Sequence, residues 1–289
     1  MRTDCTARIG DAYRYSTQVP VIRYLITAAL IIVAIGMVFP MAWMLVVSLR
    51  ANPEQYSTMA QMVQGQTTVV NYTDAWQSDN FLRYFLNSSL VAAVVTAANV
   101  LFCFWAGYAF ARHRFRGNAL LFASVLGVLI IPQQVIMIPL YRLISELGWI
   151  NTYWALIVPW LVTPFGIFLV RQYVENLPSD IEDAARLDGA GEWNILFRIV
   201  MPLCRPILTV LAIYVFLSNW NSFLFPFLFT TDEQHRTLPV GLAFYLGKQS
   251  IDWGHLMAGA SIAALPVLIL FSVFQRRIIE GLTAGALKE

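Results

Sequence analysis

Residues Arg171–Arg205 read RQYVENLPSDIEDAARLDGAGEWNILFRIVMPLCR, and this polar segment lies between two long apolar runs. It holds four basic and six acidic residues. On insertion scales, one charged side chain at the centre of a membrane helix costs about 2.5–3.5 kcal/mol. We therefore expect the polar segment to project into water, and its neighbours on both sides to lie in lipid.

The composition extends this reading to the rest of the chain. Of the 289 residues, 58% are apolar and 12% charged, whereas a soluble protein usually has about 25% charged residues. Six stretches lack Asp, Glu, Lys and Arg and have the length of a membrane-spanning helix, roughly 20 residues. They are Tyr24–Val47, Leu86–Phe110, Ala119–Leu140, Thr152–Val170, Ile207–Phe229 and Leu256–Phe274. We expect an all-α integral membrane protein with six transmembrane helices, the fourth and fifth kinked at Pro159, Pro164 or Pro226.

The basic residues orient these helices. Of the 19 lysines and arginines, fourteen lie on the side that holds both termini and the polar segment, and five lie on the other side. The short connection at residues 111–117, ARHRFRG, is the strongest single marker. Because cytoplasmic loops are enriched in Lys and Arg, both termini and the polar segment are predicted to be cytoplasmic.

Local signals predict two short helices in the polar segment. Ser179 is the expected N-cap of the first helix, with Glu182 as its capping-box partner. Gly189 is the expected left-handed terminator of that helix. A second helix is expected from Glu192 to Val200, stopped by Pro202. From these patterns alone, a solvated connector is as good an interpretation as a binding element.

The spacing within the segment resembles the EAA loop of bacterial ABC importer permeases. That loop has the pattern EAA, three residues, G, nine residues, I, one residue, LP. The sequence keeps this spacing with Asp183-Ala184-Ala185, Gly189, Ile199 and Met201-Pro202, and departs from the pattern only in Asp183 for Glu and Met201 for Leu.

The likeness covers nearly the whole chain. It is closest to the carbohydrate-type permeases of the maltose and glycerol-phosphate importer group, as the second type of permease in such a pair. Further matching positions are Ile131-Pro132, Gly148, Leu187–Ala190, Trp220-Asn221, Leu238–Gly241, Trp253-Gly254 and Gly281–Ala286.

This resemblance implies a binding-protein-dependent inner membrane component that forms the translocation path for a sugar or a glycerol-phosphate-like solute. The implied partners are a second, different permease subunit, two ATPase subunits that use the ATP, and an extracytoplasmic substrate-binding protein. In this family the first helix of the EAA loop docks in a cleft of the ATPase. The residues implied in ATPase coupling are Glu182, Asp183, Ala184, Ala185, Asp188, Gly189, Ile199 and Pro202.

The implied organisation has four parts in a multi-pass protein of the bacterial inner membrane. Residues 1–23 form a cytoplasmic N-terminal segment, and residues 24–85 the first transmembrane helix with an outer loop. Residues 86–280 form the permease core, with the coupling loop at 171–205. Residues 281–289 form a cytoplasmic tail. The outer stretch Thr230–His255 is expected to touch the substrate-binding protein.

Polar residues inside the predicted helices are the candidates for the translocation path. They are Asn99, Asn219, Trp220, Asn221 and Ser222. Amides within lipid need partners, so they face a wet cavity or neighbouring helices. Interhelical packing is an equally good interpretation for each of them. The four consecutive positions from Asn219 to Ser222 span more than one face of a helix, so they cannot all line a path.

The sequence offers no pattern for catalysis, metal binding, cofactor binding or nucleic-acid binding. Gly241–Lys248 departs from a phosphate-binding loop in its spacing and in Gln249, where Ser or Thr is required. Cys5, Cys103 and Cys204 share no metal spacing and are expected to be free thiols. The alternative function is a self-sufficient secondary transporter or channel. That class is typified by intramembrane ionisable residues and internal repeats, and neither is detected.

Overall fold

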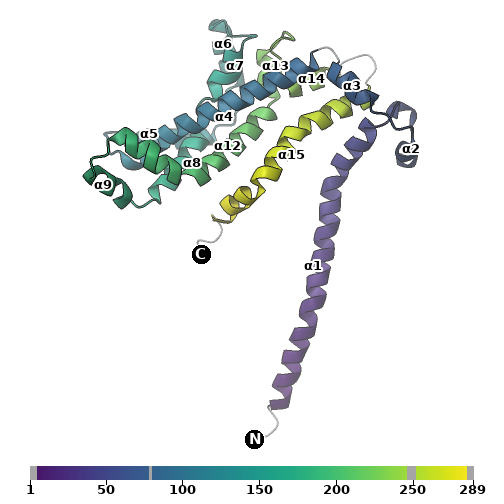
Figure 1. Ribbon diagram of the computed structural model, residues 1–289, viewed down its shortest axis with the longest axis horizontal. Helices are drawn as coiled ribbons and strands as arrows, with labels where there is room; N and C mark the ends of the chain where they lie inside the picture. The colour runs from purple at the N-terminus through teal and green to yellow at the C-terminus, as the bar shows by residue number, and fades with distance from the viewer. Residues whose placement is uncertain (1–4, 78–79, 246–251, 285–289) are drawn as a thin grey trace. The chain divides into compact units, whose positions relative to one another are not determined.

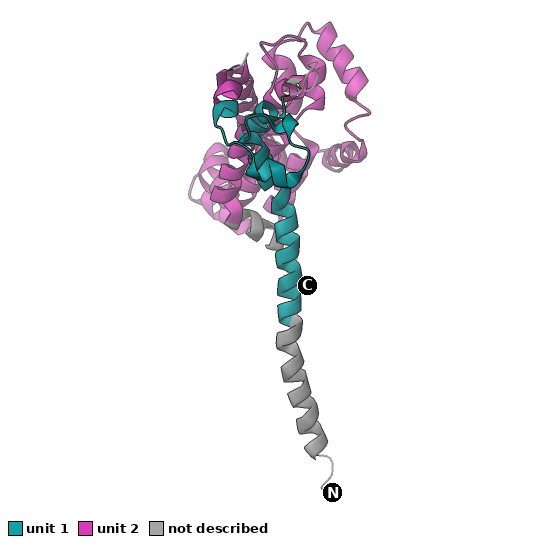
Figure 2. Ribbon diagram, turned by 90° about the vertical axis from the view of Figure 1, so that its right-hand side faces the viewer, with its two compact units in different colours: residues 1–72, 252–261 teal, residues 73–251, 262–289 magenta. Residues whose placement is uncertain are grey.

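The structure is a computed structural model that describes residues 5–77, 80–245 and 252–284 (Figure 1). In these residues, helices and their connections make up the chain, with one isolated antiparallel bridge between Arg50 and Thr67. The chain divides into two compact units, residues 1–72 with 252–261 and residues 73–251 with 262–289 (Figure 2). Parts of the expected termini, including Lys288, and the outer residue Lys248 lie outside the described residues.

The first unit contains α1 (Cys5–Ser48), η1 (Pro53–Gln55) and α2 (Met59–Gln64), and α3 (Val70–Gln77) begins in it. The stretch Arg23–Ser48 of α1 is apolar on all sides, as a helix surrounded by lipid must be. The loop that follows is organised by buried Arg50, whose guanidinium donates to the carbonyl oxygens of Gly65 at 2.8 Å and Val63 at 2.5 Å.

The second unit is built around α4 (Phe81–Arg112). This helix packs against α8 (Pro164–Glu175) and α12 (Arg205–Trp220), as Figure 1 shows. Their facing side chains form the main apolar core, in which several large residues are fully buried: Val95, Phe104, Val170, Val174, Ile195 and Leu211. The core therefore lies on α4, and every site described below contacts that helix or its two neighbours.

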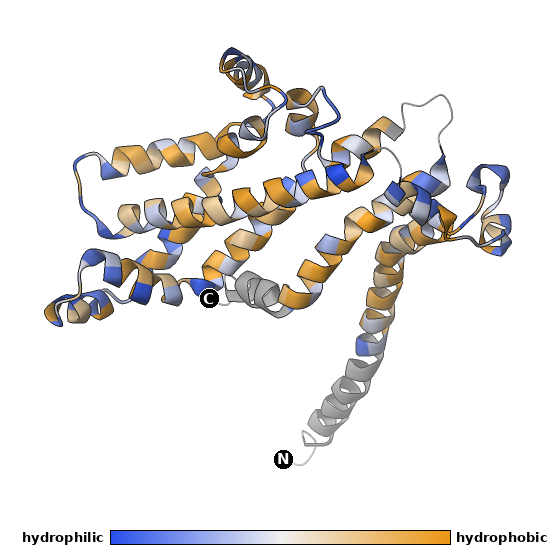
Figure 3. Ribbon diagram, turned by 45° about the horizontal axis from the view of Figure 1, so that its top comes forward, coloured by the Kyte–Doolittle hydropathy of each residue, from blue (hydrophilic) through white to orange (hydrophobic). Residues whose placement is uncertain are grey.

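Shorter elements complete the second unit. They are α5 (Asn118–Ile130), α6 (Met137–Glu146), α7 (Tyr153–Ile157), η2 (Val158–Trp160), α9 (Asp180–Leu187), α10 (Glu192–Asn194), the π-helix η3 (Ile195–Val200), α11 (Met201–Leu203), α13 (Leu224–Phe229) and α14 (Leu238–Tyr245). The long helix α15 (Trp253–Ala284) contributes to both units. Figure 3 shows that apolar residues dominate the long helices and that polar residues gather in the connections.

Four helical stretches among the described residues are long and apolar enough to cross a membrane: Arg23–Ser48, Phe81–Arg112, Tyr153–Glu175 and Trp253–Gln275. A fifth is added if Glu192–Leu203 and Arg205–Trp220, which meet at 76°, form one bent span. The chain is thus an all-helical protein with several candidate membrane spans.

Three of the six predicted helices are not continuous: the third, the fourth and the fifth. The third, predicted as Ala119–Leu140, ends at Ile130, and α6 begins only at Met137. The cause is Pro132, which disfavours helical geometry in the residue before it; Ile131 is extended, with φ −78° and ψ 118°. The fifth, predicted as Ile207–Phe229, ends at Trp220 and resumes as α13.

The predicted effect of proline is confirmed in the fourth helix and wrong in the fifth. Pro159 lies in the 3₁₀ turn η2, and Pro164 opens α8, so the helix is interrupted between them. Proline suits the first turn of α8 because no backbone donor is needed there. In the fifth helix, however, Pro226 lies inside α13, and the interruption falls earlier, after Trp220.

Candidate functional site

The first helix of the polar segment is α9, and its start differs from the prediction. Ser179 makes no side-chain capping bond, and Glu182 does not reach back to it. Instead Glu182 turns toward α4, where its carboxylate accepts hydrogen bonds from Arg112 Nε at 2.6 Å and Tyr108 Oη at 2.9 Å. The predicted capping box is therefore wrong, because an ion pair with a neighbouring helix takes the Glu182 side chain.

The end of α9 confirms the prediction for Gly189. This residue has φ +83°, in the left-handed region that favours glycine. Its N–H donates to the Arg186 carbonyl at 3.0 Å, and the Ala190 N–H donates to the Ala185 carbonyl at 2.9 Å. These two bonds form a Schellman motif, which turns the chain sharply after Asp188.

The candidate coupling residues on α9 divide between two faces. Glu182 and Ala185 are buried against the rest of the second unit. Asp183 and Ala184 are exposed, as are Asp188 and Gly189 beyond the end of the helix. Leu187 is 91% exposed, the highest exposed fraction among the large apolar residues in the part of the chain that the structure describes, and Ile181 is 41% exposed. The outward face therefore combines acidic residues with these two apolar side chains.

Arg186 ties α9 to the helix that follows. Its guanidinium donates to Asp183 Oδ1 at 2.8 Å and to Glu192 Oε1 at 2.9 Å. The hydrogen bond from Arg186 lowers the pKa of Glu192, and the same bond raises the pKa of Arg186. A depressed carboxyl pKa means that this tie is present at neutral pH and is lost only as the pH falls below the ordinary range of Glu.

The second predicted helix continues past Pro202. It consists of α10, the π-helix η3 and α11, and the chain then bends by 76° near Cys204 before α12. The helix ends at Leu203, one residue after Pro202, so the observed end lies within a residue of the predicted stop. Ile199 and Pro202 are half-buried in this stretch, behind α9.

A cavity of about 90 Å³ lies beside α12 in the second unit. It has room for a few water molecules. Its lining combines hydroxyl and amide groups with aromatic faces: Gln133, Trp160, Thr163, Tyr214, Val215, Ser218, Asn219, Ser222 and Phe225. The cavity therefore offers both hydrogen-bonding groups and flat apolar surfaces to a small polar solute.

Of the five residues predicted to line the translocation path, only some line this cavity. Asn219, in the last turn of α12, and Ser222, just after the end of that helix, line it. Asn99 is fully buried and donates to the Trp160 carbonyl at 2.9 Å, so it supports the cavity wall. Trp220 is buried elsewhere and donates to the Ala263 carbonyl at 3.0 Å. Asn221 is exposed and donates to the Leu217 carbonyl of its own helix.

The candidate set left out several lining residues, among them Gln133, Trp160, Thr163 and Tyr214. Gln133 and Thr163 each accompany a proline, Pro132 or Pro164, at a point where a predicted span is interrupted. Backbone at a helix interruption within a membrane protein is tolerated where it lines a cavity or is buried in protein. The neighbouring prolines could therefore have identified Gln133 and Thr163 as candidate lining residues. No sequence feature of this kind marks Trp160 or Tyr214.

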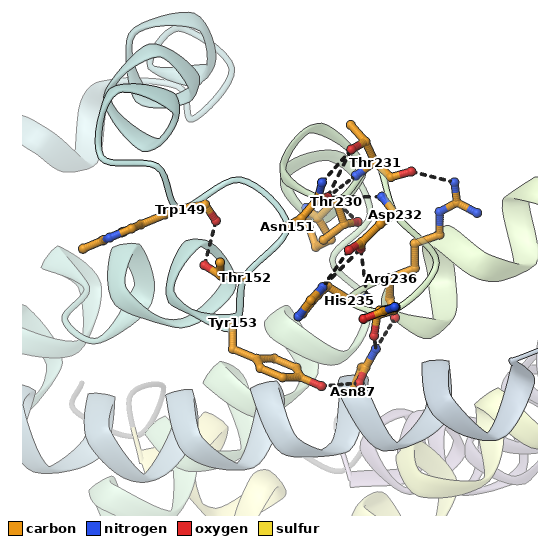
Figure 4. Close-up of polar contacts among 12 residues, drawn as sticks. Asn87, Trp149, Asn151, Thr152, Tyr153, Thr230, Thr231, Asp232, His235 and Arg236 are labelled. Atoms are coloured by element: carbon orange, nitrogen blue, oxygen red, sulfur yellow. Dashed lines mark hydrogen bonds and ion pairs between the residues drawn. The ribbon is translucent and has the colours of Figure 1, made fainter.

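A third polar cluster joins α4 to the loop after α13 (Figure 4). Asn87 is buried, and its amide donates to the carbonyls of Gln234 and Arg236, each at 2.9 Å. Its oxygen accepts from Tyr153 Oη at 2.7 Å, and the Tyr153 ring lies edge-on to His235. These bonds fix residues 234–236, part of the stretch expected to touch a binding protein, against α4.

The chain matches a known family over a region that contains α9, the cavity beside α12 and all of the third cluster except Asn87. The family model described as "binding-protein-dependent transport system inner membrane component" matches residues 99–283. The chain belongs to this family. The permease is 37% identical to the trehalose/maltose transport system permease protein MalG of Thermococcus litoralis, over 92% of the chain and 97% of that protein. It is 34% identical to the arabinooligosaccharides transport system permease protein AraQ of Halalkalibacterium halodurans, over 93% and 98%.

The fold agrees with that of a solved importer. The permease superimposes with a TM-score of 0.80 on a chain of a bacterial ABC transporter involved in the import of the acidic polysaccharide alginate. The match covers 89% of the permease and 96% of that chain, at 19% identity. The protein is therefore a permease subunit of an ABC importer, a transport subunit and not an enzyme. The alternative of a self-sufficient secondary transporter or channel does not agree with these matches.

Proposed function

We propose that the permease pairs with a second, different permease subunit to form the translocation path for a sugar or a glycerol-phosphate-like solute. Two ATPase subunits lie on the cytoplasmic side and use the ATP, and a substrate-binding protein delivers the solute from outside. The observation that carries this proposal is the outward face of α9, where Leu187 is 91% exposed beside a left-handed Gly189. An apolar side chain that projects into water is stabilised when a partner's cleft covers it.

In this proposal the ATPase contacts the exposed face of α9, which carries Asp183, Ala184, Asp188 and Gly189. Glu182 and Ala185 act from behind, by holding α9 on the permease. Ile199 and Pro202 belong to the stretch that connects α9 to α12 and so set the direction in which α9 projects. The eight candidate coupling residues thus have three different tasks.

The solute class is supported by the relatives named for trehalose, maltose and arabinooligosaccharides. The lining of the cavity beside α12 agrees with such a solute in its chemistry, because sugars present hydroxyl groups to amides and apolar ring faces to aromatic side chains. Its volume of about 90 Å³ means that the path must widen before a disaccharide enters. We assign Asn219 and Ser222 to the solute path and Asn99 to its wall. Trp220 and Asn221 are assigned to helix packing and to the protein surface.

The proposed topology has six crossings of the bacterial inner membrane with both termini in the cytoplasm. The third crossing is made by α5 and the residues around Pro132, and the fifth by α12 and α13. This topology is supported by the excess of Lys and Arg on one side. The four-part division into residues 1–23, 24–85, 86–280 and 281–289 follows from it.

The test is to purify the permease with the second permease, ATPase and binding protein encoded beside it, and to measure ATP hydrolysis in lipid nanodiscs. A panel of trehalose, maltose, arabinooligosaccharides and glycerol phosphate is added with the binding protein. We expect at least one of these to raise ATP turnover. If none does although the complex assembles, the solute class is wrong. If no complex with an ATPase forms, the partner assignment is wrong.

A further inference from the structure

The inner end of α4 is bound to α9 by what we call the inner clamp, Tyr108, Arg112 and Glu182. The Glu182 side chain is 5% exposed and that of Arg112 is 15% exposed. Arg112 also donates through Nη2 to the Leu177 carbonyl at 2.7 Å, so it holds the chain just before α9 as well. A buried carboxylate is stable only while its partners remain, which makes this contact stiff.

The other end of α4 is bound by what we call the outer clamp, Asn87, Ser88 and Tyr153 (Figure 4). Asn87 donates to two carbonyls of the loop after α13, and Ser88 Oγ accepts from the Leu238 N–H at 2.7 Å. Asn87 and Ser88 are each 3% exposed. Both clamps are therefore buried, directional sets of hydrogen bonds on the same helix.

The helix α4, which carries both clamps, is one uninterrupted helix of 32 residues without proline. At 1.5 Å per residue, Asn87 and Arg112 are separated by about 37 Å along its axis. The two spans that pack along α4 in the main core lack this continuity. The stretch Tyr153–Glu175 is interrupted between η2 and α8, and the stretch through α12 is bent by 76° at Cys204. A displacement passes through such interruptions less directly than through a straight helix.

We propose that α4 is a rigid link between α9 and the loop at residues 234–238, with Glu182 as a positioning residue that acts through Arg112 and Tyr108. This inference rests on the proposed coupling role of α9. When an ATPase displaces α9, the inner clamp moves the end of α4, and the outer clamp carries the movement to the loop that faces the binding protein. The four residues of α4 that form the clamps have no other task in the proposed mechanism.

The inner clamp is tested by spin labels on Ser179→Cys at the start of α9 and Leu86→Cys of α4, both at exposed positions outside the proposed ATPase contact. Cys5 is replaced by Ser, and the buried Cys103 and Cys204 are kept. In the assembled complex, the distance between the labels is measured without nucleotide and after trapping with ATP and vanadate. We expect the same distance in both states, because α9 and α4 move together. With Arg112→Met, the distance changes on trapping, whereas the control Arg116→Met, at an exposed position in the adjoining loop, leaves it constant.

The outer clamp is tested by Tyr153→Phe, which removes only the hydroxyl that binds Asn87, with Tyr141→Phe on α6 as control. The readout is the stimulation of ATP hydrolysis by the binding protein loaded with the most active sugar of the panel. We expect Arg112→Met to reduce this stimulation by roughly 5- to 150-fold, the range of typical coupling between distant sites. Tyr153→Phe reduces it less, and both controls retain it.

The outcomes separate the two levels of the proposal. If Arg112→Met keeps the wild-type distance on trapping and the wild-type stimulation, the link is refuted while the importer assignment stands. If the wild-type complex hydrolyses no ATP, the proposed function itself fails. Should Arg112→Met not assemble, Arg112→Lys keeps the charge but loses one of the two donor groups. An intermediate stimulation then supports the link, and a full wild-type value refutes it.

Discussion

Substitution of Gly189 separates the shape of the α9 corner from the contact that it makes. A Cβ added at Gly189 meets no atom within 4 Å, so packing within the permease does not oppose a side chain there. The cost comes from φ +83°, which for an alanine amounts to about 1–2 kcal/mol. Asn and Asp tolerate this conformation better, because their side chains bond locally. We expect the strain to follow the order Ala above Asn and Asp.

This strain is measured by hydrogen exchange of the Ala190 amide, which bonds the Ala185 carbonyl at 2.9 Å in the Schellman motif. A cost of 1–2 kcal/mol corresponds to a loss of protection of roughly 5- to 30-fold in Gly189→Ala. Gly189→Asn and Gly189→Asp are expected to lose less. The local structure of the permease is therefore nearly preserved in Gly189→Asp.

Coupling is measured on the same variants as sugar uptake per ATP hydrolysed in proteoliposomes. Gly189→Asp places a charged side chain on the face proposed to enter the ATPase and is expected to abolish coupled uptake despite its mild strain. Gly191→Asp is the matched control, since Gly191 has φ −71° and is also open around its Cβ. Wild-type uptake by Gly189→Asp refutes the docking of this corner. If Gly191→Asp loses uptake to the same degree, the added charge explains the loss in both variants, and the position of Gly189 does not.

Two further predictions compare neighbouring residues on opposite faces. Ala184 is exposed, whereas Ala185 is 8% exposed. We therefore expect Ala184→Asp to yield an intact but uncoupled permease. Ala185→Asp buries a charge and is expected to lower the thermal stability of the purified subunit. Equal melting temperatures for the two variants contradict the assignment of faces. Asn219→Ala, in the cavity wall, is expected to raise the sugar concentration for half-maximal ATP turnover, and Asn221→Ala is expected to leave it unchanged. If Asn221→Ala raises this concentration and Asn219→Ala does not, the cavity is not part of the solute path.

Much of the fold followed from composition and spacing, because lipid imposes a simple rule on side chains. Apolar stretches predicted the central parts of α1, α4 and α15, each of which is one uninterrupted helix that extends beyond the predicted bounds at both ends. Gly189 was predicted correctly because a left-handed helix end depends on the residue itself and its neighbours in sequence. The interruptions around Pro132 and after Trp220 were not predicted, because hydropathy averages over a window and does not detect a break in the backbone.

The sequence by itself determined the membrane character, the family resemblance and the existence of a polar segment with a glycine corner. All three depend on composition and on spacing along the chain. The tertiary structure decided which side chains of that segment face outward. Glu182 and Asp183 are adjacent carboxylates, yet one is buried against Arg112 and the other is exposed beside Arg186. The same holds for Asn219 and Trp220, which are neighbours in sequence and lie in different surroundings. The reason is that a buried polar group takes its partner from another helix, about 70 residues away for Glu182, and no local pattern encodes that meeting.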